Sequence, residues 1–285
     1  MVAPGLVVVD KPPGLTSHDV VARVRRLAGT RKVGHAGTLD PMATGVLVLG
    51  VDRATRLLGH LMLTEKAYDA TIRLGVATTT DDAEGEVVST HATDDVDADV
   101  VRTELARFVG DIEQVPTAVS AIKVDGKRAY ARVRDGEQVE LKARPVTIHE
   151  LVVHDVSLPD VTVSVRCSSG TYIRAIARDL GAALGVGGHL TALRRTAVGA
   201  FDLSVARTLE ALADDFTVLP IADAARATFA TVDLDDTQAA DVRVGRPLDL
   251  VLPGEGPHAV FAPGGEFLAL YEQRGPRAAP VAVFV

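Results

Sequence analysis

One stretch, GHAGTLDPMATG at residues 34–45, constrains this chain more than any other, because it surrounds a single carboxylate, Asp40, with three glycines and a proline. Pro41 restricts Asp40 to an extended backbone, whereas Gly37 and Gly45 permit tight reversals and a close approach of a ligand. Most such aspartates cap their own turn. A basic helix is expected before the loop and a buried strand, VLVLGV, after it. These neighbours also allow a carboxylate held ionised at the rim of a sheet, which could act as a nucleophile.

The composition is that of a globular intracellular protein. The 285 residues are 47% hydrophobic, enough for the core of one large domain and a small one. The single cysteine, Cys167, excludes an intramolecular disulfide and a cysteine-based zinc site. No apolar run approaches the roughly 20 residues that cross a bilayer, and the N-terminus lacks the pattern of a signal peptide. We therefore expect a cytoplasmic protein that does not bind membranes.

The net charge of −8 is distributed unevenly along the chain. Residues 1–66 carry nine Lys/Arg against five Asp/Glu, and residues 166–200 carry five against one. Residues 120–150 are also basic on balance, whereas residues 80–115 carry eleven acidic side chains against two basic ones. One basic face could therefore bind a polyanion in spite of the acidic total.

Hydrophobic periodicity predicts a mixed α/β (α+β) fold with a largely antiparallel sheet flanked by helices. The expected helices begin at Ser17 as N-cap, at Arg53, at Asp97 and near Thr171. Strands are expected at 5–11, 46–51 and 66–75, with a hairpin over 151–167. Another strand, an Asp-Gly turn and a basic helical segment that holds Tyr130 are expected within 120–139.

The last part of the chain has a different texture. Residues 223–285 are acidic and contain five short strand candidates, VDL, DLVL, HAVFA, FLALYEQ and PVAVFV, between Pro/Gly turns. This pattern predicts a small β-rich module such as a compact barrel. We place the domain boundary between residues 222 and 223.

Two further side chains are candidates for chemistry. Arg174, near the start of the helix in CSSGTYIRAIARDLG, is either solvated or points inward to pair with a functional carboxylate. Tyr68, in an alternating strand, is either a core residue or a platform on which a base stacks. The histidines show no metal-ligand spacing, and the chain has no nucleotide-binding glycine motif. We therefore expect no metal and no cofactor.

Several long motifs occur in a fixed order: DKPPGLTSHDVV, KVGHAGTLDPMATGVLVLGVDRATRL, KAYDATIRLG, VPTAVSAIKVDGKRAYARVRDG, CSSGTYIRAIARDLG and HLTALRRTAVGAF. Together they resemble the bacterial tRNA pseudouridine synthases of the TruB family, from residue 5 to about residue 205. The tail resembles the family's PUA-like C-terminal module. The resemblance implies a pseudouridine-synthase fold and a cofactor-free isomerisation of uridine 55 in the TΨC loop of tRNA, on a flipped-out base.

The resemblance also assigns roles to individual residues. It implies that Asp40 is the nucleophile, that Tyr68 stacks on the flipped uracil and assists proton removal from carbon 5, and that Arg174 pairs with Asp40. His35 would fill the space that the flipped nucleotide leaves, and Asp82 would buttress Arg174. The uracil pocket would be lined by Tyr172 and Leu193, whereas Lys11 would be structural.

Two alternatives to this function stay open at this point. One is a catalytically idle protein that binds or folds tRNA through the same basic face, and the other is a related synthase that works with a guide RNA. The compact chain without basic tails argues against the guide-RNA class and favours action on the T-arm alone, and nothing in the sequence demands more than a monomer. The acidic C-terminal module could bind tRNA or only stabilise the protein.

Overall fold

The computed structural model describes residues 2–117, 123–124, 127–128 and 141–285. Within these residues one large sheet contains β1 (Gly5–Lys11), β2 (Val33–His35), β3 (Thr44–Val51), β4 (Lys66–Leu74), β7 (Gly110–Gln114), β10 (Arg144–Ser157), β11 (Asp160–Cys167), β12 (Gly188–Val198), β13 (Phe201–Asp202) and β14 (Leu219–Pro220). Two small two-stranded sheets are formed by β5 (Val76–Thr78) with β6 (Val87–Thr90) and by β8 (Lys123–Val124) with β9 (Lys127–Arg128). The helices of this part are α1 (Ser17–Ala28), η1 (Asp52–Arg56), α2 (Leu58–Leu61), α3 (Ala98–Ala106), α5 (Ile173–Ala183), α6 (Leu209–Asp214) and α7 (Ile221–Thr228).

The large sheet runs in the order β14-β1-β3-β12-β4-β11-β10-β7, with β2 and β13 paired beside this path. Among the described strands of this sheet only the β3–β12 pair is parallel. The predicted mixed α/β class with a largely antiparallel sheet is therefore confirmed. The β3–β12 contact joins the segment after the Asp40 loop to the strand that carries Leu193, and Arg195 lies opposite Gly45 there.

Strand β1 shows how one sheet has a core on both sides. Val7 and Val9 belong to a core cluster with residues of α1 and α6, whereas Leu6 and Val8 belong to another with residues of α2 and α7. This arrangement follows from the alternation of side chains along a strand, and it buries the whole GLVVV run. Further along the sheet, α5 and α3 pack on β4, β12 and β10. The opposite face of β4 is exposed at Asp69.

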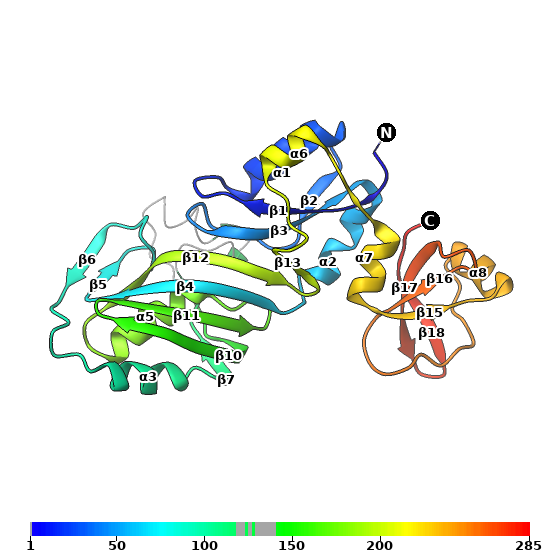
Figure 1. Cartoon of the computed structure of the whole chain (residues 1–285). Coiled ribbons are helices and arrows are strands. Elements are labelled where there is room, and N and C mark those ends of the chain that lie inside the picture. Colours follow the sequence, from blue (N-terminus) through cyan, green and yellow to red (C-terminus); the bar gives the residue numbers. More distant parts are fainter. Residues whose placement is uncertain (1, 118–122, 125–126, 129–140) are drawn as a thin grey trace.

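The C-terminal part lies at one end of the molecule, beyond α7 (Figure 1). Its strands β15 (Ala230–Asp233), β16 (His258–Phe261), β17 (Phe267–Arg274) and β18 (Arg277–Val283) form a sheet in that order, with helix α8 (Asp236–Arg243) beside it. The β-rich module is confirmed, but its sheet is a four-stranded path rather than a barrel. The stretch DLVL at 249–252 forms no strand. Residues 222 and 223, between which we expect the domain boundary, both lie inside α7.

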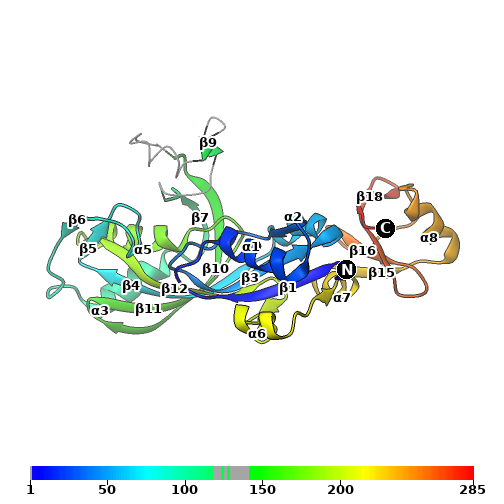
Figure 2. The same ribbon diagram turned by 90° about the horizontal axis from the view of Figure 1, so that it is seen from above.

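The local predictions differ from the structure mainly at element ends. Thr16, rather than Ser17, caps α1, and its hydroxyl accepts from the backbone of Asp19 in a capping box. The helix expected from Arg53 is divided into η1 and α2. The hairpin β10–β11 forms as predicted. The basic helical segment with Tyr130 falls outside the described residues. Seen from above in Figure 2, the large sheet extends from the β5–β6 hairpin to α7.

Across the part of the chain that the structure describes, no helix has the length and apolar character needed to span a membrane.

Candidate active site

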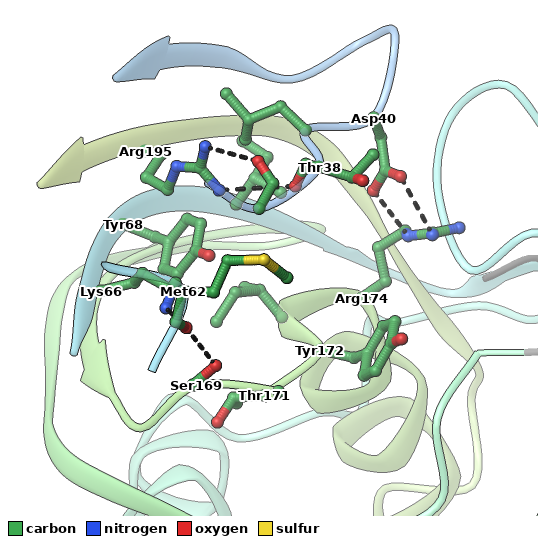
Figure 3. A pocket seen from close by; sticks show the side chains of 15 residues that line it. Thr38, Asp40, Met62, Lys66, Tyr68, Ser169, Thr171, Tyr172, Arg174 and Arg195 are labelled. Atoms are coloured by element: carbon green, nitrogen blue, oxygen red, sulfur yellow. Dashed lines mark hydrogen bonds and ion pairs between the residues drawn. The ribbon is translucent and has the colours of Figure 1, made fainter. Parts of the chain in front are cut away.

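A pocket of about 280 Å³ opens where the Asp40 loop, β4, β12 and the start of α5 meet (Figure 3). Five side chains that the sequence singled out line it: Asp40, Tyr68, Tyr172, Arg174 and, from β12, Leu193. The structure therefore brings together residues more than 100 positions apart in the sequence. Met62, Lys66 and Arg195 also line it.

Side chains from three elements hold the backbone of the loop around Asp40. From α1, the buried Ser17 hydroxyl donates to the carbonyl of Leu39 at 3.0 Å and accepts from the Leu39 N–H at 2.8 Å. From β1, the Lys11 ammonium donates to Pro41 O at 3.1 Å and to two carbonyls of its own loop. From β12, Arg195 donates to the carbonyls of Gly37 and Thr38 at 3.2 and 3.4 Å. Asp40 is thus fixed from both sides by tertiary contacts.

Two glycines allow this geometry. Gly37 and Gly45 have φ values of +99° and +97°, which side chains disfavour. A Cβ at Gly45 would also stand 2.1 Å from the carbonyl oxygen of Arg195. Glycine at position 45 is therefore required both for its backbone angle and for the close approach of β3 to β12.

Asp40 forms a two-contact ion pair with Arg174. The Nε atom of Arg174 lies 3.1 Å from Oδ2 of Asp40, and its Nη2 atom lies 3.3 Å from Oδ1. The other terminal nitrogen donates to Thr80 O at 2.8 Å and to Asp82 Oδ2 at 3.1 Å. Asp82 is itself buried and accepts from the hydroxyl of Thr80 and the N–H of Glu84. The predicted contacts of Arg174 with Asp40 and Asp82 are both present.

Burial is the largest influence on the Asp40 carboxyl, and it raises its pKa above the ordinary value of 3.8. Arg174 opposes this effect most strongly, Asp82 reinforces it, and Lys11 and Arg195 lower the pKa from further away. The net shift of the pKa is upward. We expected the basic surroundings to dominate, but desolvation outweighs them. One third of the side chain is still exposed, which leaves the carboxylate open to the pocket.

The aromatic and apolar walls of the pocket are also fixed by neighbours. Tyr68 lies on β4 in the expected alternation, and Leu193 lies on the adjacent strand β12 opposite Ala70. Burial raises the pKa of the Tyr68 hydroxyl, and the nearby charge of Arg195 opposes that increase. The backbone of Tyr172 exchanges two hydrogen bonds with the buried side chain of Gln114, at 2.8 and 3.1 Å.

His35 lies outside the pocket wall. It ends β2, and its ring meets that of His18 edge to face at a centroid distance of 5.6 Å. Lys11 does not line the pocket either, and its three carbonyl acceptors agree with a structural lysine. Burial lowers the pKa of Lys11 to about 8.

Sequence reasoning missed three residues that organise the site: Lys66, Gln114 and Arg195. A signal existed for two of them, Arg195 and Lys66. Arg194 and Arg195 are adjacent in a strand, so their side chains point to opposite faces and one of them had to point inward. Arg194 forms a two-contact pair with Asp10, whereas Arg195 is buried. Lys66 stands two residues before Tyr68 in an alternating strand, so the alternation places both side chains on the same buried face. Nothing in the periodicity marks Gln114.

The side chains available for chemistry here are a carboxylate that is paired with a cation, a tyrosine, and an apolar wall. In the described residues, no group of three or more His, Cys, Asp or Glu side chains is placed to hold a metal ion. A carboxylate that faces a pocket lined by a tyrosine and a leucine has the side chains that covalent catalysis on a base would need.

Comparison with known proteins agrees with this geometry. Residues 25–173 match the model of the TruB family pseudouridylate synthase N-terminal domain. Residues 174–226 match the tRNA pseudouridylate synthase B C-terminal domain, and residues 229–285 match the C-terminal domain of tRNA pseudouridine synthase II.

Similar proteins include two named tRNA pseudouridine synthase B. The one from Arthrobacter sp. (strain FB24) is 57% identical over 294 residues, covering 98% of this chain and 96% of the relative. The one from Thermobifida fusca (strain YX) is 57% identical over 292 residues, covering 99% of both.

Two solved structures have similar folds. A chain in an H/ACA RNP bound to a substrate RNA containing 2'-deoxyuridine has a TM-score of 0.76 at 25% identity, covering 99% of this chain and 85% of that chain. A chain in a Cbf5-Nop10-Gar1 complex has a TM-score of 0.78 at 26% identity, with the same coverage. The ordered motifs, the pocket and these matches lead to one conclusion: the chain belongs to the TruB family of pseudouridylate synthases.

Proposed function

We propose that this protein converts uridine 55 in the TΨC loop of tRNA to pseudouridine, with Asp40 as the nucleophile. The observation that carries the proposal is the carboxylate of Asp40, held by Arg174 at 3.1 and 3.3 Å where it faces a pocket bounded by Tyr68 and Leu193. A base inside a stacked arm cannot reach such a pocket, so the target nucleotide must flip out of its stack.

The roles of the site residues follow from their contacts. Asp40 attacks the flipped nucleotide, and two positions are open to it, C1' of the ribose and C6 of the uracil. Arg174 aims the carboxylate and counteracts the rise of its pKa that burial causes. Tyr68 and Leu193 hold the ring between them, and Tyr68 assists removal of the proton from carbon 5. Tyr172 borders the uracil, Asp82 holds Arg174, and His35 occupies the space that the nucleotide leaves in the T loop.

The substrate is the T-arm of tRNA, bound by a monomer without a guide RNA, a metal or a cofactor. The relatives at 57% identity carry tRNA in their names, which supports this choice over the guide-dependent class. The basic segments 1–66 and 166–200 contribute Lys66, Arg174 and Arg195 to the pocket, which supports an RNA substrate at this place. We expect the protein to work in the cytoplasm.

We propose two domains, a catalytic one at 1–222 and a PUA-like one at 223–285, connected through α7. The small domain shares its core with the large one, because Phe261, Phe267 and Phe284 pack in one cluster with Leu57 and Leu61. Arg56 also donates to the carbonyl of Val283 at 2.8 Å. We infer that the acidic module stabilises the catalytic domain.

The test uses a T-arm stem-loop whose target uridine carries tritium at carbon 5. The wild-type protein should release tritium and form pseudouridine, whereas Asp40→Asn should do neither and should bind the RNA within a few-fold of wild type. The matched control is Asp69→Asn, on the exposed face of β4, which should turn over normally. Normal turnover by Asp40→Asn would disprove the nucleophile, and a wild-type protein that binds without releasing tritium would be a tRNA-binding module instead.

A further inference from the structure

Two cations that the proposed roles do not use line the pocket, Lys66 from β4 and Arg195 from β12 (Figure 3). Only 7% of Lys66 and 1% of Arg195 is exposed. Within the described residues, both are bound by backbone carbonyls and neither forms an ion pair with a carboxylate. Arg174, by contrast, is matched by Asp40 and Asp82. The pocket therefore contains positive charge that the described part of the chain does not neutralise.

Lys66 retains hydrogen-bonding capacity toward the pocket. Its ammonium donates to Met62 O at 2.7 Å and to Thr64 O at 2.6 Å. An ammonium has three N–H groups, and the third has no acceptor among the described residues. The neighbouring thiol of Cys167 is no counter-ion at neutral pH, because burial raises its pKa to about 11.

The two cations also lie close to each other. A Cβ built on Gly37 would be 3.7 Å from Nη1 of Arg195 and 4.0 Å from Cε of Lys66, so both side chains border the same point of the loop. Burial, and then the repulsion from Arg195, lower the pKa of Lys66 to about 8. Placing two like charges together in a buried wall is costly unless a negative charge compensates them. This pair therefore fits an anion that is present only during the reaction.

The proposed reaction generates such an anion by either route of attack. If Asp40 adds to C6, the new O–C6 bond displaces the π electrons of the C5–C6 bond toward C4, which gives an enolate with charge on O4. If Asp40 attacks C1', the C1'–N1 bond breaks and its electron pair stays on N1, delocalised over O2 and O4. The ring carries one negative charge in both cases.

We propose that Lys66 and Arg195 form a cationic wall that stabilises the anionic uracil ring during isomerisation. The inference rests on the proposed function and extends it, because it assigns the stabilisation of the negative charge on the ring to two residues other than the Asp40–Arg174 pair. Lys66 offers its free N–H to a ring oxygen, and Arg195 contributes its charge from the loop side. Donors that meet charge as it develops are typically worth a factor of about 10²–10³ in rate.

The experiment compares two T-arm substrates, one with uridine and one with 5-fluorouridine at the target position, under single-turnover conditions. Lys66→Met and Arg195→Met should slow consumption of the uridine substrate by about 10²–10³-fold. With 5-fluorouridine the loss should shrink to about tenfold or less, because fluorine withdraws electrons and stabilises the anionic ring itself. Lys66→Arg, which keeps the charge, should recover most of the rate.

The matched control is Arg194→Met, which removes the neighbouring arginine that Asp10 already neutralises; it should stay within a few-fold of wild type on both substrates. Thermal unfolding identifies variants that fail to fold, and Lys66→Met with Lys66→Arg decides the question if Arg195→Met is one of them. Equal losses on both substrates, or no loss with uridine, would overturn the cationic wall. A wild-type protein without pseudouridine formation would overturn the proposed function instead.

Discussion

Gly45→Ala tests whether the close contact between β3 and β12 positions the Asp40 loop. The added Cβ would lie 2.1 Å from the carbonyl oxygen of Arg195 and 2.9 Å from its nitrogen, whereas ordinary contacts begin at 3.4 Å. The two strands must therefore separate by about 1 Å at this point. Because Arg195 also holds the carbonyls of Gly37 and Thr38, the shift reaches both ends of the loop.

The effect of the clash can be separated from that of the backbone angle. Gly110→Ala is the matched control, because Gly110 has a φ of +104° and a Cβ there would meet nothing within 4 Å. The left-handed backbone angle should lower the free energy of unfolding of each variant by about 1–2 kcal/mol. The overlap should cost Gly45→Ala a further 1–3 kcal/mol or so. Since 1 kcal/mol moves Tm by about 2–4 °C in a chain of this size, Gly45→Ala should melt about 2–12 °C below Gly110→Ala.

Activity provides the second readout of the same variants. A displacement of about 1 Å at a reacting group can cost about 10²-fold in rate, so Gly45→Ala should lose about that much in single-turnover pseudouridine formation at a temperature where it is folded. Gly110→Ala, at the start of the edge strand β7, should retain the wild-type rate. Equal melting temperatures and equal rates for the two variants would refute the reasoning.

Three further predictions follow from the site and the module. Arg174→Gln should move the acidic limb of kcat/KM to higher pH, because Arg174 lowers the pKa of Asp40; an unchanged or lower limb in a pH–rate series would contradict this. Asp40→Asn should have a melting temperature at or above that of the wild type at neutral pH, and this increase in melting temperature should become smaller in acid. The raised pKa of Asp40 means that its protonated form stabilises the fold, and that this stability is lost as pH rises through the folded-state pKa; a gain that grows in acid, measured by calorimetry, would reverse the sign. Phe284→Ala should lower the free energy of unfolding by about 3–5 kcal/mol, because Phe284 is buried in the core that the module shares with Leu57 and Leu61. If the catalytic domain of this variant unfolds at the same denaturant concentration as in the wild type, the module does not stabilise it.

The fold was largely predictable because the periodicity of buried residues is local information. The alternation in KAYDATIRL places Tyr68 and Ile72 on one face, and the structure buries both. The end of α1 was predicted because Gly29 adopts the left-handed conformation that a helix stop needs. Its start was misplaced by one residue, because Thr16 and Ser17 are both suitable caps and only the long-range contact with Leu39 occupies Ser17.

The site was predictable only in part, because its contacts join distant segments. The charge of Arg174 next to a helix start suggested an inward pairing, and that pairing exists. The alternation of β12 required one of Arg194 and Arg195 to face inward but could not indicate which one, since the choice depends on the register with β3 and β4. Gln114 gave no signal, because its role is to exchange hydrogen bonds with the backbone of Tyr172, 58 residues away.

The glycine-rich loop illustrates how a flexible sequence can give a fixed carboxylate. Glycine increases the conformational entropy that folding must remove, so Gly37 and Gly45 alone would leave Asp40 poorly placed. Ser17, Lys11 and Arg195 restrict the loop through the carbonyls of residues 37, 38, 39 and 41. These anchors come from α1, β1 and β12, so the position of Asp40 depends on the packing of the whole sheet.

A carboxylate whose pKa is raised by burial is unfavourable for folding when ionised, and it is retained beside Arg174 where an ionised nucleophile is needed. The same reasoning applies to Lys66 and Arg195, whose unmatched charges oppose folding and become favourable once a negatively charged ring occupies the pocket.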